Sequence, residues 1–237
     1  MSSLLFFYYF VVWRRDEVAP PHNKIIKKCY NLKMNKKERL EELFKEFPGI
    51  GPRQAKRFVY FLLWKSPEYI NELSKSIAEI KAGIRKCQEC GRFYDKSESE
   101  KNICSICNNQ ARENGQIMIL EKNPDFENIE KMNIWAGKYF LIGKNLKITE
   151  TEPEKKINLF PLIKKIKEGR VKEIIFALSL NPEGELTMDW IKEQLFPLEK
   201  EYGFKMSELG RGISLGTEVE YSDKITIKSA LENRKEI

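Results

Sequence analysis

Four cysteines in the middle of the chain have the residue type and spacing that most clearly specify chemistry. They form two CxxC pairs separated by 13 residues: Cys87 and Cys90, then Cys104 and Cys107. Each pair can direct two sulfurs toward one point, and four thiolates in a tetrahedral arrangement are the ligands of a structural Zn²⁺. Because four protein ligands leave no position open for substrate, we expect one structural, non-catalytic zinc ion per chain.

Two other interpretations of these cysteines are disulfide bonds and a redox-active CxxC. Disulfide frameworks are typical of short secreted chains, whereas this chain has 237 residues, 32% of them charged, and only one further cysteine, Cys29. A redox CxxC normally occurs once, beside a βαβ pattern. The sequence therefore favours zinc, and free cysteines at zinc spacing also favour a reducing, cytoplasmic environment.

The segment between the two pairs is polar and charged, with Phe93, Tyr94 and Ile103 as its only large apolar side chains. Such a segment cannot build a core of its own, so we expect the metal to supply its folding energy. The chain must also contain elements that flank and position this segment.

Basic residues are concentrated toward the N-terminal end of the chain. Of the formal net charge of +7, residues 34–65 contribute eight Lys and Arg against four Asp and Glu, whereas residues 113–237 carry 20 against 22. A local basic excess indicates a polyanionic partner such as DNA. The longest apolar run, Leu4–Trp13, has ten residues and is too short to span a membrane, so we expect no membrane association.

Residues 1–33 do not resemble the rest of the chain. Their apolar run, Arg14-Arg15, Pro20-Pro21 and Cys29 form no periodic pattern, and Met34 opens a segment that has the appearance of an ordinary start. We expect residues 1–33 to be an atypical N-terminal extension, produced by a mis-assigned start. The alternative is a short anchor or a peripheral strand.

Residues 34–86 predict three helices around a basic turn. The first helix begins near Lys36 and ends at Pro48-Gly49, the second begins at Pro52, and the third runs from Pro67 to about Lys86. A Gly-x-Gly turn before a helix presents backbone N–H groups to a phosphate, and cations in the first helical turns add charge. The predicted DNA-binding residues are Gly49, Gly51, Arg53, Lys56 and Arg57. The alternative is an ordinary corner between helices with a solvated basic face.

Strands and helices alternate after the cysteine segment. Predicted strands are 117–120, 138–142 and 173–178, and predicted helices are 125–132, 158–168 and 185–200. Near-continuously apolar strands of this kind form a parallel sheet covered on both faces, with ligand-facing groups at the carboxyl ends of the strands. Glu121 follows the first strand, and Glu183 and Glu185 follow the third. The tail predicts a short strand near Val219–Tyr221 and a helix over Lys224–Arg234 that docks on the sheet or on a neighbouring subunit.

The order of these segments resembles the bacterial RecR family of recombination mediators. FPGIGPRQAKRFVYFLL, residues 47–63, is similar to the helix-hairpin-helix of that family, and a four-cysteine zinc ribbon and a Toprim-like domain follow in the family order. The family's C-terminal signature RG…G…EYxDxxT…AL is matched by Arg211-Gly212, Gly216, Glu218, Glu220-Tyr221, Asp223, Thr226 and Ala230-Leu231. The resemblance covers residues 36–236.

The resemblance implies a multi-module α+β fold. Its modules are a helix-hairpin-helix domain over 34–86, a four-cysteine zinc ribbon over 87–112, a Toprim-like α/β domain with a parallel sheet over 113–204, and a C-terminal strand and helix over 205–237. In the family, this last segment is exchanged between subunits. The protein is then expected to be a homotetramer that forms a ring able to encircle DNA.

The resemblance also implies partners and residue roles. RecR proteins bind single- and double-stranded DNA and, with RecO and in some cases RecF, help load RecA onto single-stranded DNA coated by SSB at gaps. Arg53 and Arg57 match basic hairpin positions implicated in DNA binding. Glu121 matches the acidic residue that ends the first Toprim strand, and Glu183 and Glu185 match a Glu-Gly-Glu-x-Thr motif near the partner-binding surface.

The sequence departs from the family pattern near that surface, because Ser179-Leu180-Asn181 occupies the place of an Asn-Pro-Thr type run. A catalytic Toprim enzyme needs a Glu and an Asp-x-Asp pair to hold Mg²⁺, and this sequence contains no Asp-x-Asp. We therefore predict a protein that is not an enzyme. The alternative is a Toprim-type DNA-cleaving enzyme such as a topoisomerase, primase-like protein or nuclease. A DNA ligase fragment would need Lys-x-Asp-Gly, which is absent.

Overall fold

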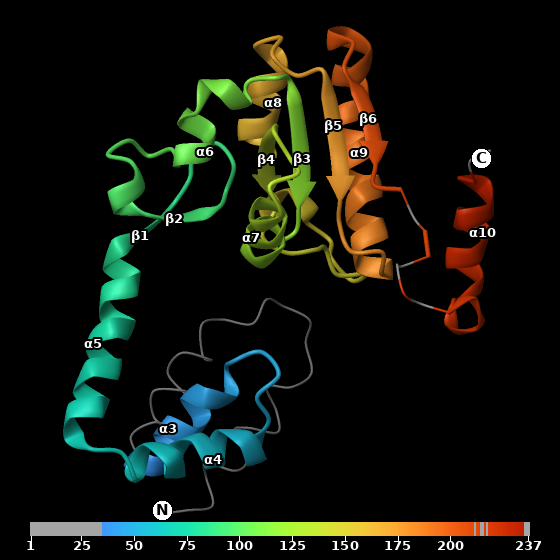
Figure 1. The fold of residues 1–237 in the computed structure, drawn as a ribbon. Helices are drawn as coiled ribbons and strands as arrows, with labels where there is room; N and C mark the ends of the chain where they lie inside the picture. The colour runs from blue at the N-terminus through green and yellow to red at the C-terminus, as the bar shows by residue number, and fades with distance from the viewer. Residues whose placement is uncertain (1–34, 211, 214–215, 217, 235–237) are drawn as a thin grey trace, which may run out of the picture. The chain divides into compact units, whose positions relative to one another are not determined.

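The computed structural model describes residues 35–210, 212–213, 216 and 218–234, and these form two compact units that are considered separately (Figure 1). The first unit extends to Ala78 and the second begins at Glu79. The predicted extension 1–33, with Cys29, lies outside the described residues, as does Arg211 of the C-terminal signature.

The first unit consists of α3 (Lys36–Lys45), α4 (Pro52–Leu63) and the start of α5 (Pro67–Gly83). α3 begins at Asn35, whose side chain accepts a hydrogen bond from the Glu38 amide while the Glu38 carboxylate accepts one from the Asn35 amide. This reciprocal pair satisfies two backbone donors that a helix start leaves unpaired. α4 begins at Pro52, a residue whose fixed φ suits the first helical position.

The contact between α3 and α4 is small. Ala55 and Val59 of α4 are buried, and the rings of Phe44 and Phe58 meet edge to face at 5.6 Å. Not every apolar side chain of α4 is covered, because Phe61 is 50% exposed. No side chain of α5 is buried among the described residues. Two or three short helices cannot enclose every apolar side chain that they carry.

The second unit opens with the cysteine segment. The predicted extension of α5 to Lys86 is wrong, because the helix ends at Gly83 and β1 (Ile84–Lys86) pairs antiparallel with β2 (Phe93–Asp95). Glycine is a poor helix former, and residues 84–86 gain backbone pairing by leaving the helix. Short helical turns complete the segment: η1 (Lys96–Glu98), α6 (Ser105–Asn108) and η2 (Gln110–Arg112).

A four-stranded parallel sheet follows, in the order β4-β3-β5-β6. Its strands are β3 (Gln116–Leu120), β4 (Lys138–Leu141), β5 (Glu173–Ala177) and β6 (Lys205–Glu208), and its helices are α7 (Asn123–Met132), α8 (Phe160–Lys167) and α9 (Pro182–Tyr202), with the short turn η3 (Pro153–Lys155) before α8. In register, Met118 of β3 lies between Tyr139 of β4 and Ile175 of β5. The predicted parallel sheet with alternating helices is confirmed.

Alternate residues of the strands face opposite layers. Ile119 and Ile174 belong to a large core cluster with Leu162 of α8 and Ile191 of α9, whereas Leu120 packs in a second cluster with Phe126 of α7. α8 and α9 therefore cover one face of the sheet and α7 covers the other, as Figure 1 shows. Both faces are buried, which explains why the sequences of β3 and β4 are almost continuously apolar.

The C-terminal segment corrects the expected position of its strand. The strand predicted near Val219–Tyr221 is the 3₁₀ turn η4, because the described residues place no strand beside it. The strand of this segment is instead Lys205–Glu208, where only Met206 is apolar and pairing with β5 decides the conformation. The helix α10 (Lys224–Glu232) follows and starts at Asp223, whose carboxylate accepts from the Ile225 and Thr226 amides. Within the described part of the chain, no helix combines the length and apolarity needed to cross a membrane.

Candidate metal centre and nucleic-acid interface

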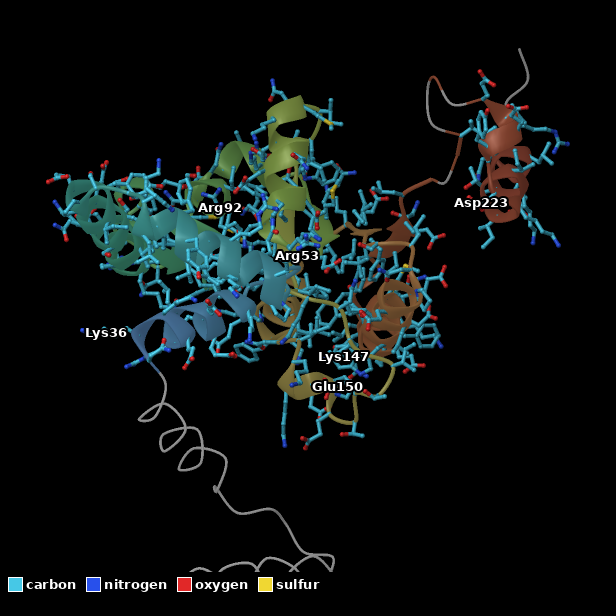
Figure 2. All side chains as sticks on the ribbon, turned by 90° about the horizontal axis from the view of Figure 1, so that it is seen from below. Lys36, Arg53, Arg92, Lys147, Glu150 and Asp223 are labelled. Carbon is cyan, nitrogen blue, oxygen red and sulfur yellow. The ribbon has the colours of Figure 1, made fainter. Side chains whose placement is uncertain are left out.

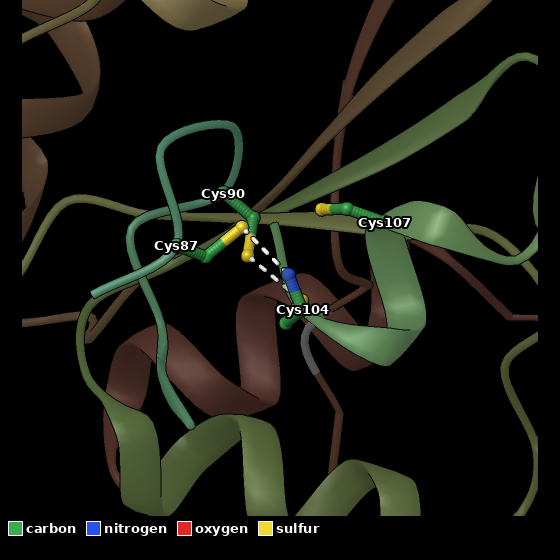
Figure 3. Close-up of side chains that lie close together, drawn as sticks. All are labelled: Cys87, Cys90, Cys104 and Cys107. Atoms are coloured by element: carbon green, nitrogen blue, oxygen red, sulfur yellow. Dashed lines mark hydrogen bonds between the residues drawn. The ribbon is translucent and has the colours of Figure 1, made fainter. Parts of the chain in front are cut away.

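The four cysteines predicted to bind metal come together in one buried cluster. Their sulfur atoms all lie within 4.8 Å of one another, and the four residues are 0–6% exposed. Figure 3 shows the sulfurs of Cys87, Cys90 and Cys104 side by side, with Cys107 extending from α6. This convergence of two pairs that are distant in sequence was predicted from their spacing.

Local backbone geometry holds the first pair. The Cys87 amide donates to the Arg92 carbonyl at 2.8 Å, and the Gly91 amide donates back to the Cys87 carbonyl at 3.0 Å. Gly91 has φ +78°, in the left-handed region where glycine carries no steric penalty. The turn therefore returns the chain on itself between Cys87 and Cys90 and leaves both sulfurs on one side.

The second pair lies at the start of α6. Cys104 precedes the helix, and its amide donates to the Cys87 sulfur at 3.3 Å, which links the two pairs directly. Beneath them Tyr94 is 2% exposed and donates from its hydroxyl to the Lys101 carbonyl at 2.8 Å. Tyr94 and the partly buried Ile103 and Ile106 are thus the apolar support of a segment that has only a small core.

The dimensions of the cluster fit a tetrahedral metal ion. The Cys90 and Cys104 sulfurs are 3.7 Å apart, and Zn–S bonds of about 2.3 Å place tetrahedral sulfurs about 3.8 Å apart. The same distance is far longer than the roughly 2.05 Å of a disulfide bond, and all four described cysteines are free. The cysteine cluster can therefore hold one ion with four sulfur ligands.

Hydrogen bonds among the sulfurs divide the thiols into two kinds. The pKa of Cys104 is lowered to about 6, first because Cys107 donates to its sulfur, and the pKa of Cys87 is lowered first through Cys104. The pKa values of Cys90 and Cys107 are raised, in both cases first through Cys104. Metal ions bind thiolates, so metal binding releases the protons that the thiols still carry.

Two cations that the sequence did not single out lie beside the cysteine cluster. Arg92 is 9% exposed and forms an ion pair with Glu98, and Lys165 of α8 forms one with Glu89 at 2.8 Å. Burial alone lowers the pKa of Lys165, but the charge of Cys107 and the bond to Glu89 outweigh it and raise the pKa. No sequence signal marks Lys165, because it is one lysine among several on α8.

The cysteine segment is attached to the edge of the parallel sheet. The Leu141 amide of β4 donates to the Cys90 carbonyl at 2.7 Å, and the Phe93 amide donates to the Asn123 side chain at 2.8 Å. A Cβ on Gly91 would lie 2.6 Å from the Leu141 carbonyl oxygen. The absence of a side chain at Gly91 therefore permits the close approach of the two backbones.

The predicted DNA-binding residues lie at the start of α4 in the first unit. Gly49 has φ +76°, and Gly51 occupies the position before Pro52 with extended backbone. Arg53, Lys56 and Arg57 are exposed, and none of them forms an ion pair with any carboxylate that the structure describes. Figure 2 shows the Arg53 side chain on this helix.

The burial pattern of α4 separates its apolar and basic sides. Ala55 and Val59 pack inward, whereas the basic residues at 53, 56 and 57 remain in solvent next to the glycine turn. Arg57 also has local support, because its guanidinium donates to the Gln54 side chain at 3.5 Å. This geometry suits contact with a phosphate backbone.

The acidic residues predicted to bind a partner lie at the carboxyl edge of the sheet. One oxygen of the partly buried Glu121 accepts from the Ser179 hydroxyl and from the Asn145 side chain, both at 3.0 Å. Glu183 and Glu185 are exposed in the first turn of α9. The sequence did not indicate Asn145 as a neighbour of Glu121, although both follow strand ends.

The turn that precedes α9 is sterically constrained. The Asn181 side chain accepts from the Gly184 amide at 2.7 Å, and a Cβ on Gly184 would lie 1.9 Å from the Ser179 carbonyl oxygen. Thr187 connects this turn to the loop after β4, because its hydroxyl donates to the Glu183 carbonyl and accepts from the Leu146 amide at 2.8 Å. The glycine between the two exposed glutamates is therefore structural.

Two family models match the chain, and both matches fall in the second unit. Residues 115–209 match the Toprim domain, and residues 212–235 match the model described as RecR, C-terminal. The first match covers the whole parallel sheet, from β3 to β6. The fold assembled above from strand order and burial is thus also found by comparison.

Curated relatives match most of the chain, and several carry the name "Recombination protein RecR". A protein of this name from Bifidobacterium animalis is 33% identical over 200 residues, which span 84% of this chain and 96% of that protein. One from Finegoldia magna is 34% identical over 201 residues, which span 84% of this chain and 96% of that protein. One from Dehalococcoides mccartyi is 32% identical over 190 residues, 80% of this chain and 89% of that protein.

Proposed function

Since the chain belongs to the RecR family of recombination proteins, which act in recombinational DNA repair, we propose that it is a non-catalytic, DNA-binding mediator. In the cytoplasm, it helps RecO, and in some settings RecF, to load RecA onto SSB-coated single-stranded DNA at DNA gaps. The observation that carries this proposal is the solvent-exposed basic turn of α4, which precedes a four-cysteine cluster and a Toprim domain in the family order.

DNA binding is proposed to depend on phosphate contacts. Arg53, Lys56 and Arg57 supply charge, and the backbone around Gly49 and Gly51 lets a phosphate approach closely. Such contacts are independent of sequence and weaken steeply with salt. A homotetrameric ring would repeat this weak site around the DNA and raise the overall affinity through effective concentration.

The cysteine cluster is proposed to hold one structural zinc ion per chain. Support comes from the four buried sulfurs, which lie within 4.8 Å of one another, and four protein ligands leave no position open for a substrate. Replacement of Cys104 by Ser should remove stoichiometric zinc from the purified protein. The matched control is Cys29→Ser, which changes the fifth cysteine and should retain the metal. Normal zinc content in Cys104→Ser would contradict the assignment.

Glu121, Glu183 and Glu185 are proposed to form the RecO-binding surface at the carboxyl edge of the sheet. Glu183 and Glu185 are exposed, and Glu121 is held between Ser179 and Asn145. Charge reversal at Glu183 and Glu185 should weaken RecO binding and leave DNA affinity unchanged. Equal loss of both affinities, or no change in RecO binding, would contradict this surface.

The non-catalytic role is proposed from the sequence. A metal-dependent Toprim enzyme would need a Glu and an Asp-x-Asp pair to hold Mg²⁺, and the sequence contains no Asp-x-Asp.

The decisive experiment measures RecA loading on gapped, SSB-coated DNA in the presence of RecO. The wild-type protein should shorten the delay before RecA filaments form, and the Arg53→Ala, Arg57→Ala variant should not. The same preparation is incubated with supercoiled DNA and Mg²⁺. Strand cleavage or relaxation would contradict the mediator proposal and would favour the alternative, a Toprim-type DNA-cleaving enzyme.

A further inference from the structure

The cysteine cluster is approached by cations from two separate parts of the second unit. Arg92 belongs to the cysteine segment itself, whereas Lys165 comes from α8 of the α/β domain, 58 residues beyond Cys107 in the sequence. The Lys165 side chain is only 16% exposed. A pocket of about 390 Å³ is lined by Lys165, Glu89 and Cys107 together, so the lysine, its acidic partner and a cysteine share one local environment.

A buried four-thiolate zinc centre carries a charge problem. One Zn²⁺ with four thiolates has a net charge of −2, and burial of such a charge is costly unless cations lie nearby. Arg92 supplies one cation, and its Nε is buried without a hydrogen-bond partner among the described residues, so Glu98 does not satisfy the whole guanidinium. Lys165 supplies a second cation, which comes from α8 of the α/β domain and not from the cysteine segment.

Lys165 differs from the other contacts between the cysteine segment and the α/β domain. Those contacts include a backbone bond from Leu141 to Cys90, a bond from Phe93 to Asn123, the Arg92 guanidinium over the Phe126 ring at 4.8 Å, and the ion pair from Arg112 to Glu130. None of them places a cation of the α/β domain beside the sulfurs. Lys165 of the α/β domain lines one pocket with Cys107, so its interaction energy depends on whether the sulfurs carry the charge of a metal-bound cluster.

We propose that Lys165 is a positioning residue of the zinc centre: it compensates the negative charge of the metal-bound thiolates and thereby couples metal loading to the packing of the cysteine segment on α8. The inference rests on the zinc ion proposed above and extends the metal site into the α/β domain. Coupling of this kind is reciprocal, so Lys165 strengthens zinc binding by the same free energy with which zinc strengthens the packing.

The test compares Zn²⁺ affinities of full-length variants by competition with a chromophoric chelator. Lys165→Met should weaken zinc binding by about ten- to a hundred-fold, the range found when outer-shell partners of metal ligands are removed. Lys165→Arg keeps the charge and should stay close to wild type. The matched control is Lys167→Met, an exposed lysine on the same helix, which should leave the affinity unchanged.

A second variant separates charge compensation from a simple salt bridge. Glu89→Gln removes the ion pair with Lys165 but leaves the cation beside the sulfurs, so zinc affinity should be retained or increased. If Glu89→Gln loses as much affinity as Lys165→Met, the ion pair and not the cluster charge is what matters, and the proposal is wrong. The proposal is equally wrong if Lys165→Met binds zinc like the wild type, or if Lys167→Met is weakened to the same extent.

The two levels of inference fail in different ways. A wild-type protein that takes up no stoichiometric zinc would defeat the zinc assignment itself. A wild-type protein that binds zinc tightly, with an equally tight Lys165→Met variant, would leave the zinc centre in place and remove only the role of Lys165. Circular dichroism of each metal-free variant identifies any global unfolding, and the rescue by Lys165→Arg distinguishes lost charge from lost structure.

Discussion

The amide of Leu141 donates a 2.7 Å hydrogen bond to the carbonyl oxygen of Cys90. Leu141 ends the edge strand of the parallel sheet and Cys90 is one of the four clustered cysteines, so this bond connects the sheet to the cysteine cluster. Sheet edges carry unpaired backbone groups that must be covered, and here the cysteine segment covers part of one edge. Order in the cluster is therefore linked to order at the sheet edge.

Hydrogen exchange should report this link. Removal of the metal, by chelation or by Cys104→Ser, should accelerate exchange of the Leu141 amide, because its acceptor belongs to a segment that lacks a core of its own. The Ile119 amide in the central strand β3 should keep its protection and serves as the internal control. Unchanged exchange at Leu141 in the metal-free protein would show that the cysteine segment stays docked without metal.

Gly91 should be intolerant of a side chain. Gly91→Ala must adopt φ +78° and also place a Cβ 2.6 Å from the Leu141 carbonyl oxygen. The matched control is Gly169→Ala, where φ is +70° and no atom lies within 4 Å of the added Cβ. The left-handed conformation costs roughly 1–2 kcal/mol at both sites. In urea unfolding, Gly91→Ala should lower the free energy of unfolding more than Gly169→Ala does. Equal losses of unfolding free energy would mean that the backbones at Gly91 and Leu141 are not in close contact.

The basic turn of α4 should control DNA affinity and its salt dependence. Arg53→Ala with Arg57→Ala should weaken binding to gapped DNA at low salt and reduce the slope of log affinity against log salt by roughly 0.9 for each lost phosphate contact on duplex DNA. A variant with two exposed lysines of the second unit replaced, Lys131→Ala with Lys147→Ala, changes net charge equally. If both variants lose the same affinity, general charge rather than the hairpin governs binding.

The Glu113–Lys138 ion pair predicts a specific acid dependence of stability. The hydrogen bond from Lys138 lowers the pKa of Glu113 below its ordinary value. The stabilisation is therefore complete above the unfolded-state pKa, about 4.3, and is lost as pH falls through the lower folded-state pKa. The free energy of unfolding is measured by denaturant titration at about pH 7 and again below about pH 4.3. Glu113→Gln should make the difference between these two free energies smaller, because it removes the contribution of the ion pair. Lys138→Met should remove the same part, and the double variant should lose no more, because the two side chains act as one pair.

Solution mass with and without gapped DNA tests the proposed ring. A tetramer should have four times the mass of one chain and should retain this stoichiometry on DNA. A monomer in both conditions would contradict multivalent binding, because one exposed turn of three cations gives only weak affinity.

The amino-acid sequence by itself determined the features that depend on local pattern. The spacing of Cys87, Cys90, Cys104 and Cys107 predicted one cluster, because each CxxC turn sets the direction of two sulfurs. Continuous apolar runs such as residues 117–120 predicted buried parallel strands, because both of their faces must be covered. The glycine turn before Pro52 predicted the start of α4, since proline suits the first helical position. Three roles remain predictions: DNA binding by the basic turn of α4, zinc binding by the four cysteines, and RecO binding by Glu121, Glu183 and Glu185.

Only the tertiary structure decided what depends on partners distant in the chain. Lys205–Glu208 is a strand because β5 offers it backbone pairing, and Val219–Tyr221 is not a strand because the described residues offer it none. α5 ends at Gly83 because the next three residues pair with β2. Lys165 and Cys107 line the same pocket because α8 packs on the sheet that also docks the cysteine segment. Such contacts are set by long-range packing, which leaves no periodic signal in the sequence around either partner.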